Sequence, residues 1–587
     1  MRVRAGVAFA VWVALAGVPN AAAATFAVTR TDDPAPGACN SDCSLREAVL
    51  AANAGSGGDT IALPAGHYRL AVPGPGEDAA ATGDLDLTEN VTITGAGARS
   101  TVVDAQGIDR VLDVASGASA TISNITVTGG LTAGDGGGIR SAGVVSLVRD
   151  AIVGNRGLGS GGGIESSGPT AITESTISGN QAMASGGGLH AGGAAEVQSS
   201  TISGNVAGGP GWTGYGGGID AGTGTTLTLK SSTVTNNQSF NSALSGAGLE
   251  AAPASEAANT IVAHNVAHSE DQAAAAVSDC GGTLESLGHN LSDGTDCGFV
   301  HATDRQGVPV LLGPLAANGG PTDTQAVLPG SLALDAGAGC AAVDQRGVSR
   351  PRGSACDIGA YELAPPLAET GAASNVAFSS ATLGGTVDPS FHETTARFEY
   401  GRTTAYGSST PAQIVGSGNG QVAVAASLAG LRQGITYHFR LIAQNSEGTT
   451  TGADHVFTTL DKTPPALTLV RVDPGLFHRR AGATIRFTLS EAATVTLRFD
   501  HVLRGVKRRG RCVARTRRNR HRRPCARYLP VAGSVVVTGS EGPNSLHFDA
   551  RVDGKLLTFG AYRLRARARD SAGNLGKTVV AAFRVLR

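Results

Sequence analysis

The sequence lacks most of the short motifs by which catalytic and metal-binding proteins are recognised. It contains no C-x-x-C or H-E-x-x-H pair, no G-x-S-x-G, no G-x-x-x-x-G-K-S/T phosphate loop and no G-G-x-G-x-D-x calcium repeat. These absences argue against a zinc or calcium site, a serine nucleophile and nucleotide binding. We therefore expect no cofactor and no metal.

Long hydrophobic runs are also scarce, and the one that stands out lies at the N-terminus. Residues 1–24 begin with Arg2 and Arg4, continue with an apolar run and end with small residues that include Ala22, Ala23 and Ala24. This order is that of a secretory signal peptide, and the run is shorter than the ~20 residues needed to cross a bilayer. The sequence predicts a secreted, extracellular protein, free or associated with a cell surface, with no transmembrane span after the signal is removed.

Acidic residues are scarce in the C-terminal part. Residues 463–587 hold 26 Lys+Arg against 7 Asp+Glu, whereas the rest of the chain holds 20 against 40. The net charge of −1 therefore conceals a strongly basic C-terminal module. Such asymmetry predicts that this module meets an anionic partner.

Glycine is abundant, at 84 of 587 residues, which is about twice its usual ~7% share. It does not follow the triplet period of collagen, so it indicates a fold with a tight turn every few residues. The length predicts several domains.

Eight cysteines are present, and export makes them candidates for disulfides. The alternative, a metal site, has no supporting ligand spacing. From proximity in the sequence we predict the pairs Cys39–Cys43, Cys280–Cys297, Cys340–Cys356 and Cys512–Cys525.

A repeat of 25 residues begins at residue 120. The phrase STISGN occurs at 175–180 and again at 200–205, and the turn GGGI or GGGL recurs at the same spacing. A fixed period in the twenties indicates one supersecondary unit stacked on its copies. The aliphatic positions that repeat are Ile122, Leu147, Ile172 and Val197, then Val127, Ile152, Ile177 and Ile202, and then Ile139, Ile164 and Leu189.

The repeat favours a parallel β-helix over a leucine-rich repeat, because the L-x-x-L-x-L pattern is missing and short Thr/Ile/Val strands alternate with Gly and Asn turns. Each coil then lays its apolar residues on those of the next, about 4.8 Å away. Four asparagines recur at one turn, where we expect them to adopt a left-handed backbone and to stack their amides. They are Asn155, Asn180, Asn205 and Asn237.

A short amphipathic helix precedes the repeat. Ser44 to Glu47 has the S-x-x-E form of a capping box, and Leu45, Ala48, Val49 and Ala52 fall on one helical face. We expect this helix to cover the open end of the β-helix, with a Cys39–Cys43 bridge fixing its start. A redox-active cysteine pair is disfavoured by export.

Two segments resemble known motifs. CSLREAVLAAN at 43–53 resembles the CSLREA motif that opens a class of exported bacterial β-helix proteins. Residues 319–337 and 344–362 are similar to the choice-of-anchor Q domain that closes such helices. The resemblance implies a right-handed, pectate-lyase-like β-helix over 25–365, with an N-terminal cap at 39–54 and a C-terminal closing segment at 311–362. It implies no particular reaction.

Two β-sandwich domains are expected after the β-helix. Leu431, six residues before Tyr437, resembles the tyrosine corner of fibronectin type III domains, which predicts such a sandwich over 366–460. Over 562–569 apolar residues alternate with arginines, which indicates one apolar and one cationic face. Residues 463–587 are therefore predicted to form a basic Ig-like sandwich, which resembles the C-terminal β domains of exported actinobacterial proteins.

A basic segment at 504–528 lies within this last domain, and we expect it to be a disulfide-closed loop. One interpretation is a solvated loop, and the other is a grip for wall polymer, acidic polysaccharide, lipid headgroups or nucleic acid. Only His521 and Tyr528 are aromatic, so we expect no sequence-specific nucleic-acid binding. The candidate polyanion-binding residues are Arg504, Lys507, Arg508, Arg509, Arg511, Arg515, Arg517, Arg518, Arg520, Arg522, Arg523 and Arg527.

One column of the β-helix carries candidate catalytic residues. The residue after each GGGI-type turn should point outward, and the series reads Arg140, Glu165, His190, Asp220, Glu250. Stacking predicts about 5 Å between the last two, the separation of a retaining glycosidase pair. Trp212 and Tyr215 lie nearby in sequence as candidates for stacking on a sugar.

The sequence thus supports two functions. The first is a noncatalytic scaffold or adhesin-like binding protein whose cationic C-terminal domain contacts an anionic cell-wall or extracellular polysaccharide. The second is a polysaccharide lyase or glycoside hydrolase, with Asp220, Glu250, Glu165 and His190 as candidate catalytic residues. Whether the protein is an enzyme is left open, with the noncatalytic function favoured because the column mixes charge signs without a catalytic motif.

Overall fold

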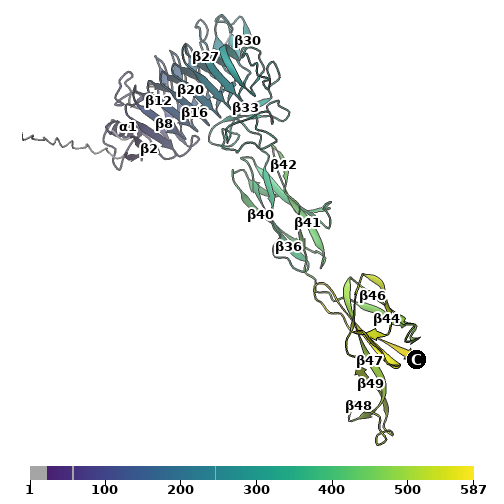
Figure 1. The fold of residues 1–587 in the computed structure, drawn as a ribbon. Coiled ribbons are helices and arrows are strands. Elements are labelled where there is room, and N and C mark those ends of the chain that lie inside the picture. The colour runs from purple at the N-terminus through teal and green to yellow at the C-terminus, as the bar shows by residue number, and fades with distance from the viewer. Residues whose placement is uncertain (1–22, 56–57, 245) are drawn as a thin grey trace, which may run out of the picture.

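The structure, a computed structural model, describes residues 23–55, 58–244 and 246–587. Its described part is almost entirely β, with one helix, and forms three bodies in a row (Figure 1). A parallel β-helix comes first, and two β-sheet domains follow it. The predicted all-β fold class is confirmed. The predicted signal peptide lies outside the described residues except for its last two.

We call the β-helix the shaft, and its strands stack in four parallel series, or faces. Face 1 consists of β1 (Thr25–Ala27), β2 (Asp59–Leu63), β5 (Val91–Gly95), β8 (Ser119–Ser123), β12 (Val144–Val148), β16 (Thr170–Thr173), β20 (Ala195–Gln198) and β24 (Leu227–Lys230). Face 2 consists of β4 (Leu85–Leu87), β7 (Leu112–Val114), β11 (Ile139–Ser141), β15 (Ile164–Ser166), β19 (Leu189–Ala191) and β23 (Ile219–Ala221). The long strands β27 (Leu249–Ala258) and β31 (Cys280–Gly288) continue both faces.

Two further faces complete each coil. Face 3 consists of β3 (Gly66–Arg69), β6 (Thr101–Asp104), β9 (Thr126–Thr128), β13 (Ala151–Val153), β17 (Thr176–Ser178), β21 (Thr201–Ser203), β25 (Thr233–Thr235), β28 (Ile261–Ala263) and β32 (Leu291–Ser292). Face 4 consists of β10 (Leu131–Thr132), β14 (Arg156–Gly157), β18 (Gln181–Ala182), β22 (Val206–Ala207), β26 (Gln238–Phe240) and β29 (Val266–His268), with β30 (Ala275–Val277) added antiparallel.

The aliphatic positions of the 25-residue repeat form single columns inside the shaft. On face 1, Leu147 stands in register with Ile122 on one side and Ile172 on the other, and Val197 follows Ile172. All four side chains are fully buried. The second series stacks in the same way on face 3. The stacked coils predicted from the sequence are therefore confirmed.

A ladder of buried asparagines marks one turn of each coil. Nδ2 of Asn155 donates to Oδ1 of Asn180 at 3.1 Å, and equivalent bonds link Asn180 to Asn205 and Asn205 to Asn237. The predicted stacking of amides is confirmed. The predicted left-handed backbone is wrong for these asparagines, because the residue before each one adopts it, such as Gly154 with φ 68°. Glycine takes this conformation without a Cβ clash, which leaves the asparagine side chain inside the turn.

The helix α1 (Leu45–Asn53) covers the first coils, as predicted. Oγ of Ser44 accepts the N–H of Glu47 at 3.3 Å, and Oε2 of Glu47 accepts the N–H of Ser44 at 2.8 Å, so the capping box is present. The predicted apolar face of the helix is buried, and it packs on β1, β2 and β4. The sequence did not indicate that Arg46 is also fully buried, paired with Asp33 at 2.9 Å.

Residues 311–362, expected to close the β-helix, lie along face 3 of the shaft. We call this segment the strap; it contains the hairpin β33 (Leu312–Ala316) and β34 (Thr324–Val327). Oγ1 of Thr201 donates to Oε1 of Gln345 at 2.6 Å, and the N–H of Ala360 donates to Oγ1 of Thr233 at 3.0 Å.

Phe299, 3% exposed, lies in the apolar core with the cysteines of the last coil. The four disulfides are those predicted.

The first β-sheet domain has two sheets around a core that includes Leu383, Phe398 and Phe439. The hydroxyl of Tyr437 accepts the backbone N–H of Arg432 at 3.0 Å and ties a loop to a strand. One sheet consists of β35 (Leu367–Thr370), β36 (Ser380–Asp388) and β40 (Val422–Ala429). The other consists of β37 (Thr394–Gly401), β38 (Ser408–Ser409), β39 (Gln413–Gly416), β41 (Thr436–Asn445), β42 (Gly448–Thr451) and β43 (His455–Thr458).

The second β-sheet domain is also a two-sheet sandwich with its own apolar core. Along β54 the apolar side chains from Tyr562 to Ala568 are buried and the alternating arginines are not, as the pattern predicts. One sheet consists of β44 (Leu467–Asp473), β46 (Ala483–Leu489) and β51 (Gly542–Phe548). The other consists of β45 (Leu476–His478), β47 (Ala493–Arg508), β48 (Arg511–Ala514), β49 (Pro524–Pro530), β50 (Val535–Gly539), β54 (Gly560–Arg569) and β55 (Val579–Leu586).

Candidate functional site

The outward column predicted on the shaft is present on face 2. Each short strand there buries its first and third residues and directs the middle one away from the core, as Ile219 and Ala221 do around Asp220. The strands pair in parallel without a shift of register. The stacked middle residues are Arg140, Glu165, His190, Asp220 and Glu250.

The column continues toward the N-terminus through two residues that the sequence analysis missed. Asp113 is the register partner of Arg140, and Asp86 is the partner of Asp113. Nε of Arg140 lies 3.1 Å from Oδ2 of Asp113. The signal that would have found them is a hydrophobic–Asp–hydrophobic triplet, which has the form of the later strands but follows no GGG turn.

His190 and Asp220 form a hydrogen-bonded pair, with Nδ1 of the imidazole 2.9 Å from Oδ2 of the carboxylate. This bond raises the pKa of His190 against the opposing effect of burial. The pKa of Glu165 is raised mainly by burial, with the charge of Asp135 adding to it. The hydrogen bond to Asp220 therefore favours the protonated imidazole of His190.

Glu250 lies at the C-terminal end of the column. Burial raises the pKa of its carboxyl, and the charge of Asp220 adds to the effect. Its Oε2 has no hydrogen-bond partner among the described residues. The carboxyl is therefore biased toward the protonated form, which is the property of a general acid.

His190, Asp220 and Glu250 line a shallow cavity of about 430 Å³ together with Tyr215. Of the two aromatic residues predicted to stack on a sugar, Tyr215 is therefore at the site. Trp212 is 58% exposed and does not line the cavity. Asp220 is bonded to His190, so the cavity holds a His–Asp pair beside the carboxyl group of Glu250. Asp220 and Glu250 stand in register on neighbouring strands, and the spacing of about 5 Å between their carboxyl groups stays a prediction.

The basic segment of the second β-sheet domain is a β ribbon for most of its length, where the sequence predicted a loop. The outer half of β47 pairs with β48 on one side and β49 on the other. The turn from β47 to β48 is Arg509-Gly510, with φ of 49° and 77°, and two positive φ values are what a type I′ hairpin requires. We call residues 500–530 the arm. The strands were not predicted because the many basic residues of the arm interrupt the alternation of apolar and polar residues by which strands are recognised.

A disulfide and a glycine fix the three strands of the arm to one another. The bond Cys512–Cys525 joins β48 to β49. A Cβ added to Gly505 of β47 would lie 2.7 Å from Sγ of Cys512, closer than atoms can approach. The strands of the arm can therefore pack this closely only because residue 505 has no side chain.

Four guanidinium groups of the arm surround one hollow of about 450 Å³, formed by Arg504, Arg515, Arg520 and Arg522. None of the four is paired with a carboxylate of the described residues. The nearby carboxylate of Asp500 is 1% exposed and is already paired with Arg563 and Arg565. The hollow thus concentrates positive charge that nothing in the described protein neutralises.

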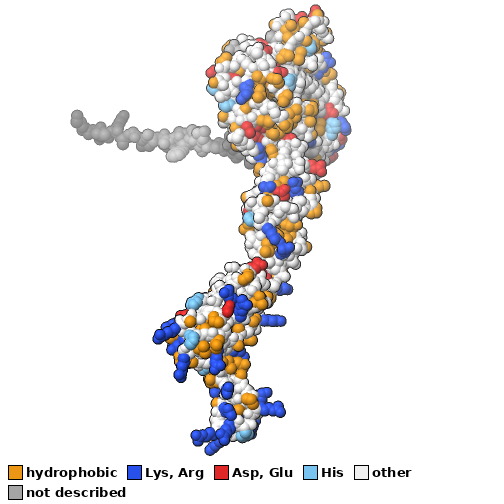
Figure 2. Space-filling view, turned by 90° about the vertical axis from the view of Figure 1, so that its right-hand side faces the viewer, with side chains coloured by type: hydrophobic (Ala, Val, Ile, Leu, Met, Phe, Trp, Pro, Cys, Tyr) orange, Lys and Arg blue, Asp and Glu red, His pale blue; other side chains and the backbone are white. Residues whose placement is uncertain are grey.

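The other eight candidate polyanion-binding residues lie on the same arm and do not line this hollow. Seven are exposed and Arg527 is half-buried. Figure 2 shows Lys and Arg side chains gathered at the far tip of the second β-sheet domain. The twelve basic residues picked out by the sequence therefore lie on one projecting element.

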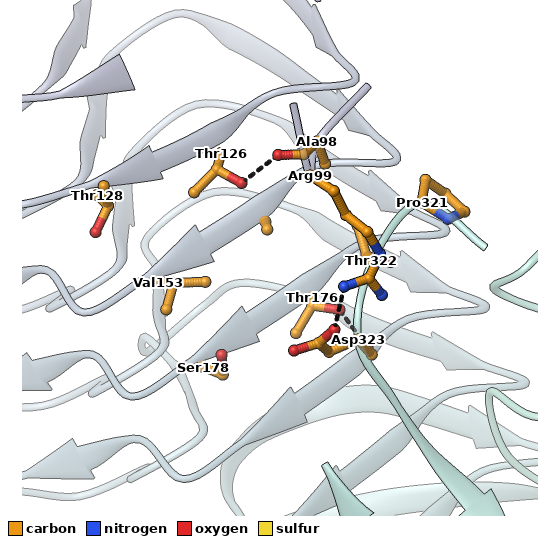
Figure 3. Close-up of a pocket in the computed structure, with 11 residues that line it drawn as sticks. Ala98, Arg99, Thr126, Thr128, Val153, Thr176, Ser178, Pro321, Thr322 and Asp323 are labelled. Atoms are coloured by element: carbon orange, nitrogen blue, oxygen red, sulfur yellow. Dashed lines mark hydrogen bonds and ion pairs between the residues drawn. The ribbon is translucent and has the colours of Figure 1, made fainter. Parts of the chain in front are cut away.

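A third hollow, of about 320 Å³, lies between the strap and face 3 (Figure 3). Arg99 and Asp323 form an ion pair across it at 2.7 Å. Oγ1 of Thr176 donates to the carbonyl of Asp323 at 2.6 Å. The remaining lining consists of uncharged side chains, mostly small ones such as Thr126 and Val153. The lining therefore offers no free acid or base. We interpret this hollow as a gap in the contact between the strap and face 3.

Three solved structures are similar to parts of the chain. The sensor domain of the anti-sigma factor RsgI4 of Pseudobacteroides cellulosolvens is 18% identical, covers 16% of this chain and 96% of its own, and has a TM-score of 0.15. The chicken CNTN1 FN1–FN3 domains are 14% identical over 38% of this chain and 67% of their own, with a TM-score of 0.18. Red sea bream transglutaminase is 10% identical over 38% of this chain and 31% of its own, with a TM-score of 0.15. Scores this low support no argument.

No curated protein matches the chain. Within its described part, no helix is long and apolar enough to cross a membrane. The family description "Right handed beta helix region" matches residues 111–288. This match agrees with the stacked coils of the four faces. The shaft is therefore a right-handed parallel β-helix.

Proposed function

We propose that this protein is an exported surface scaffold whose arm binds an anionic cell-wall or extracellular polysaccharide. The shaft would display the molecule, a fibronectin type III-like domain over 366–460 would act as a spacer, and an Ig-like domain over 463–587 would act as the foot. The observation that carries the proposal is the hollow lined by four unpaired arginines on a projecting, disulfide-fixed arm.

The chemistry of arginine supports this function. A guanidinium group presents several N–H donors in a plane and matches carboxylate, sulfate and phosphate oxygens. A polyanion bound by several such groups releases its counterions, which gives affinity that falls with salt. The arm contains few aromatic side chains for base stacking, and this favours a polysaccharide over single-stranded nucleic acid.

Export and the domain assignments have separate support. Four disulfides are typical of proteins that fold outside the cytoplasm. The capping box of α1 and the Cys39–Cys43 bond agree with the CSLREA resemblance. The bond between Tyr437 and Arg432 is that of a tyrosine corner, and this favours the fibronectin type III-like assignment.

Binding of the full chain to immobilised polygalacturonate at increasing salt tests the proposal. Replacing Arg504, Arg515, Arg520 and Arg522 by Gln should weaken binding and flatten its salt dependence. With four contacts, affinity should fall by about 100-fold between about 50 and 200 mM salt. The matched control replaces four exposed basic residues of the same domain outside the arm by Gln, namely Arg471, Arg480, Lys577 and Arg584.

Equal loss of binding in both quadruple variants would show that binding depends only on the net charge of the domain. This result would contradict a specific role for the hollow. Binding that does not change with salt would contradict a polyanion grip altogether.

A second candidate function is a polysaccharide lyase or glycoside hydrolase acting at face 2. It is favoured by the cavity that brings the His190–Asp220 pair and the raised-pKa acid Glu250 beside Tyr215. Assays for new reducing ends or unsaturated products on acidic glycans test it, with Asp220→Asn and Glu250→Gln as variants. Turnover that both variants abolish would establish an enzyme, and no turnover would leave the shaft a scaffold.

A further inference from the structure

The N-terminal end of the face 2 column lies in a group of buried acidic side chains. Asp84 and Asp86 flank Leu85, while Asp109 precedes β7 and Asp113 lies within it. These four residues are 3%, 3%, 2% and 5% exposed, respectively. A fifth carboxylate, that of Asp78, comes from the loop before β4 and is exposed to solvent.

Positive charge in this group is insufficient to balance the carboxylates. Arg110 pairs with Asp84 at 2.8 Å and with Asp113 at 3.2 Å. Arg140 pairs with Asp113 at 3.1 Å. Two guanidinium groups thus face five carboxylates, and a buried carboxylate without a counter-charge is strongly disfavoured.

Hydrogen bonding within the group is also incomplete. Among the described residues, Oδ1 of Asp113 and Oδ2 of Asp109 have no hydrogen-bond partner, although both residues are more than nine-tenths buried. Asp113 contributes to a set of three carboxylates whose ligand oxygens lie within 4.8 Å of one another; the other two are Asp78 and Asp86. Oxygens bound to one Ca²⁺ at about 2.4 Å lie no more than about 5 Å apart, so the set is compact enough for a single ion.

We propose that Asp78, Asp86 and Asp113 bind a divalent cation, Ca²⁺, at the N-terminal end of the shaft. The ligands are all hard oxygens, which suit calcium, magnesium or manganese better than copper, zinc or iron. They come from one loop and two successive coils, an irregular set that suits Ca²⁺ better than Mg²⁺, which demands near-ideal octahedral geometry. The exposure of Asp78 gives the ion access to solvent and to water ligands.

The cation supplies what the group lacks, a positive charge and a partner for a buried oxygen. It also joins the loop before β4 to the shaft. The same loop is also held by α1, since the guanidinium of Arg46 donates to the carbonyls of Ala80, Gly83 and Asp84 at 2.8–3.1 Å. Binding of Ca²⁺ therefore stabilises the connection between the helical cap and the first coils.

The test is calorimetric titration of CaCl₂, and separately of MgCl₂, into the full chain after removal of metals with a chelator. We expect a single Ca²⁺ to bind and Mg²⁺ to bind more weakly. Asp78→Asn removes a ligand charge at an exposed position, outside the buried ion pairs, and should weaken Ca²⁺ binding about tenfold or more. Asp86→Asn is the second variant. The matched control is Asp553→Asn, an exposed aspartate of the last domain, with unchanged affinity.

Thermal unfolding supplies the second readout. Ca²⁺ should raise the unfolding temperature of the wild-type shaft and raise that of Asp78→Asn less. Absence of both heat and thermal shift at millimolar Ca²⁺ would overturn the proposal. Equal Ca²⁺ affinity in the wild type and in Asp78→Asn would also overturn it, because the ion would then lie elsewhere.

Discussion

The side-chain oxygen of Asn205 accepts two hydrogen bonds from Asn180 in the preceding coil, one from the backbone N–H and one from Nδ2, each at 3.0 Å. Nδ2 of Asn205 in turn donates to Oδ1 of Asn237 at 3.0 Å. One buried side chain thus satisfies groups on both of its neighbours, so the turn of each coil depends on the next.

Asn205→Ala should therefore destabilise the shaft more than a typical surface change. Two buried donors of Asn180 lose their acceptor, which predicts a loss of about 2–4 kcal/mol in the free energy of unfolding. The measurement is denaturant unfolding of the shaft by circular dichroism. Gln198→Ala, on the outer side of face 1, is the control and should change the free energy by less than about 0.5 kcal/mol. Equal midpoints for the two variants would contradict a stabilising role for the ladder.

Asp150 predicts a pH dependence of stability. Its carboxylate is fully buried and accepts the N–H groups of Ile125 and Val148 at 2.9 Å each. Burial nevertheless raises its pKa from 3.8 to about 8. Because the folded state holds this proton more tightly than the unfolded chain, the contribution to stability is complete below pH 3.8 and is lost as the pH rises through 8.

Asp150→Ser should remove this pH dependence. Serine occupies the same place in the next two coils, at Ser175 and Ser200, where its Oγ accepts the N–H of the coil before it. We expect the variant to differ little from the wild type at pH 4 and to be more stable at pH 8 by up to roughly 5 kcal/mol. Denaturant midpoints across this pH range measure it. A wild type whose stability rises from pH 5 to pH 8 relative to the variant would contradict the prediction.

Gly505→Ala should disturb the arm without unfolding the domain. The added Cβ would meet Sγ of Cys512 at 2.7 Å and the carbonyl of Val513 at 2.8 Å, so β48 must move away from β47. Hydrogen exchange of the amides in β48 and β49 should become faster. Gly418→Ala is the control, because a Cβ there meets nothing within 4 Å. Unchanged exchange in the arm of Gly505→Ala would show that the strands are not packed as tightly as described.

Tyr437→Phe tests the tie in the first β-sheet domain. The phenol is the acceptor for the N–H of Arg432, so its removal should lower the stability of this domain by about 1 kcal/mol. The change is measured by thermal unfolding of the full chain and by hydrogen exchange of the backbone amides in β41. Tyr400→Phe in β37 is the control, because it removes the same hydroxyl from a half-buried tyrosine of the same domain. A larger effect in the control would contradict the prediction.

Much of the shaft was predictable because its information is local and periodic. Inward aliphatic residues and glycine-rich turns recur at a fixed spacing, so the columns through Leu147 and the outward series from Arg140 to Glu250 follow from the sequence alone. The capping box at Ser44 and the four cysteine pairs are likewise signals carried by near neighbours in the chain.

What was missed depends on long-range contacts or on a change of period. Asp86, Asp113 and Arg140 follow one another at intervals of 27 residues, not 25, and no GGG turn precedes the two aspartates. Short strands of the basic arm such as β48 acquire their conformation from pairing with β47 and not from their own preference. The place of the strap depends on bonds such as that between Thr201 and Gln345, 144 residues apart.

The strap also determines how the molecule would respond to mechanical load. Its bonds reach coils from Arg99 to Asn259, so they run along much of the length of the shaft. A pull on the two C-terminal domains enters through this segment and is shared among many coils at once. Tension applied there is therefore not concentrated on the last coil, and the shaft resists unravelling from that end.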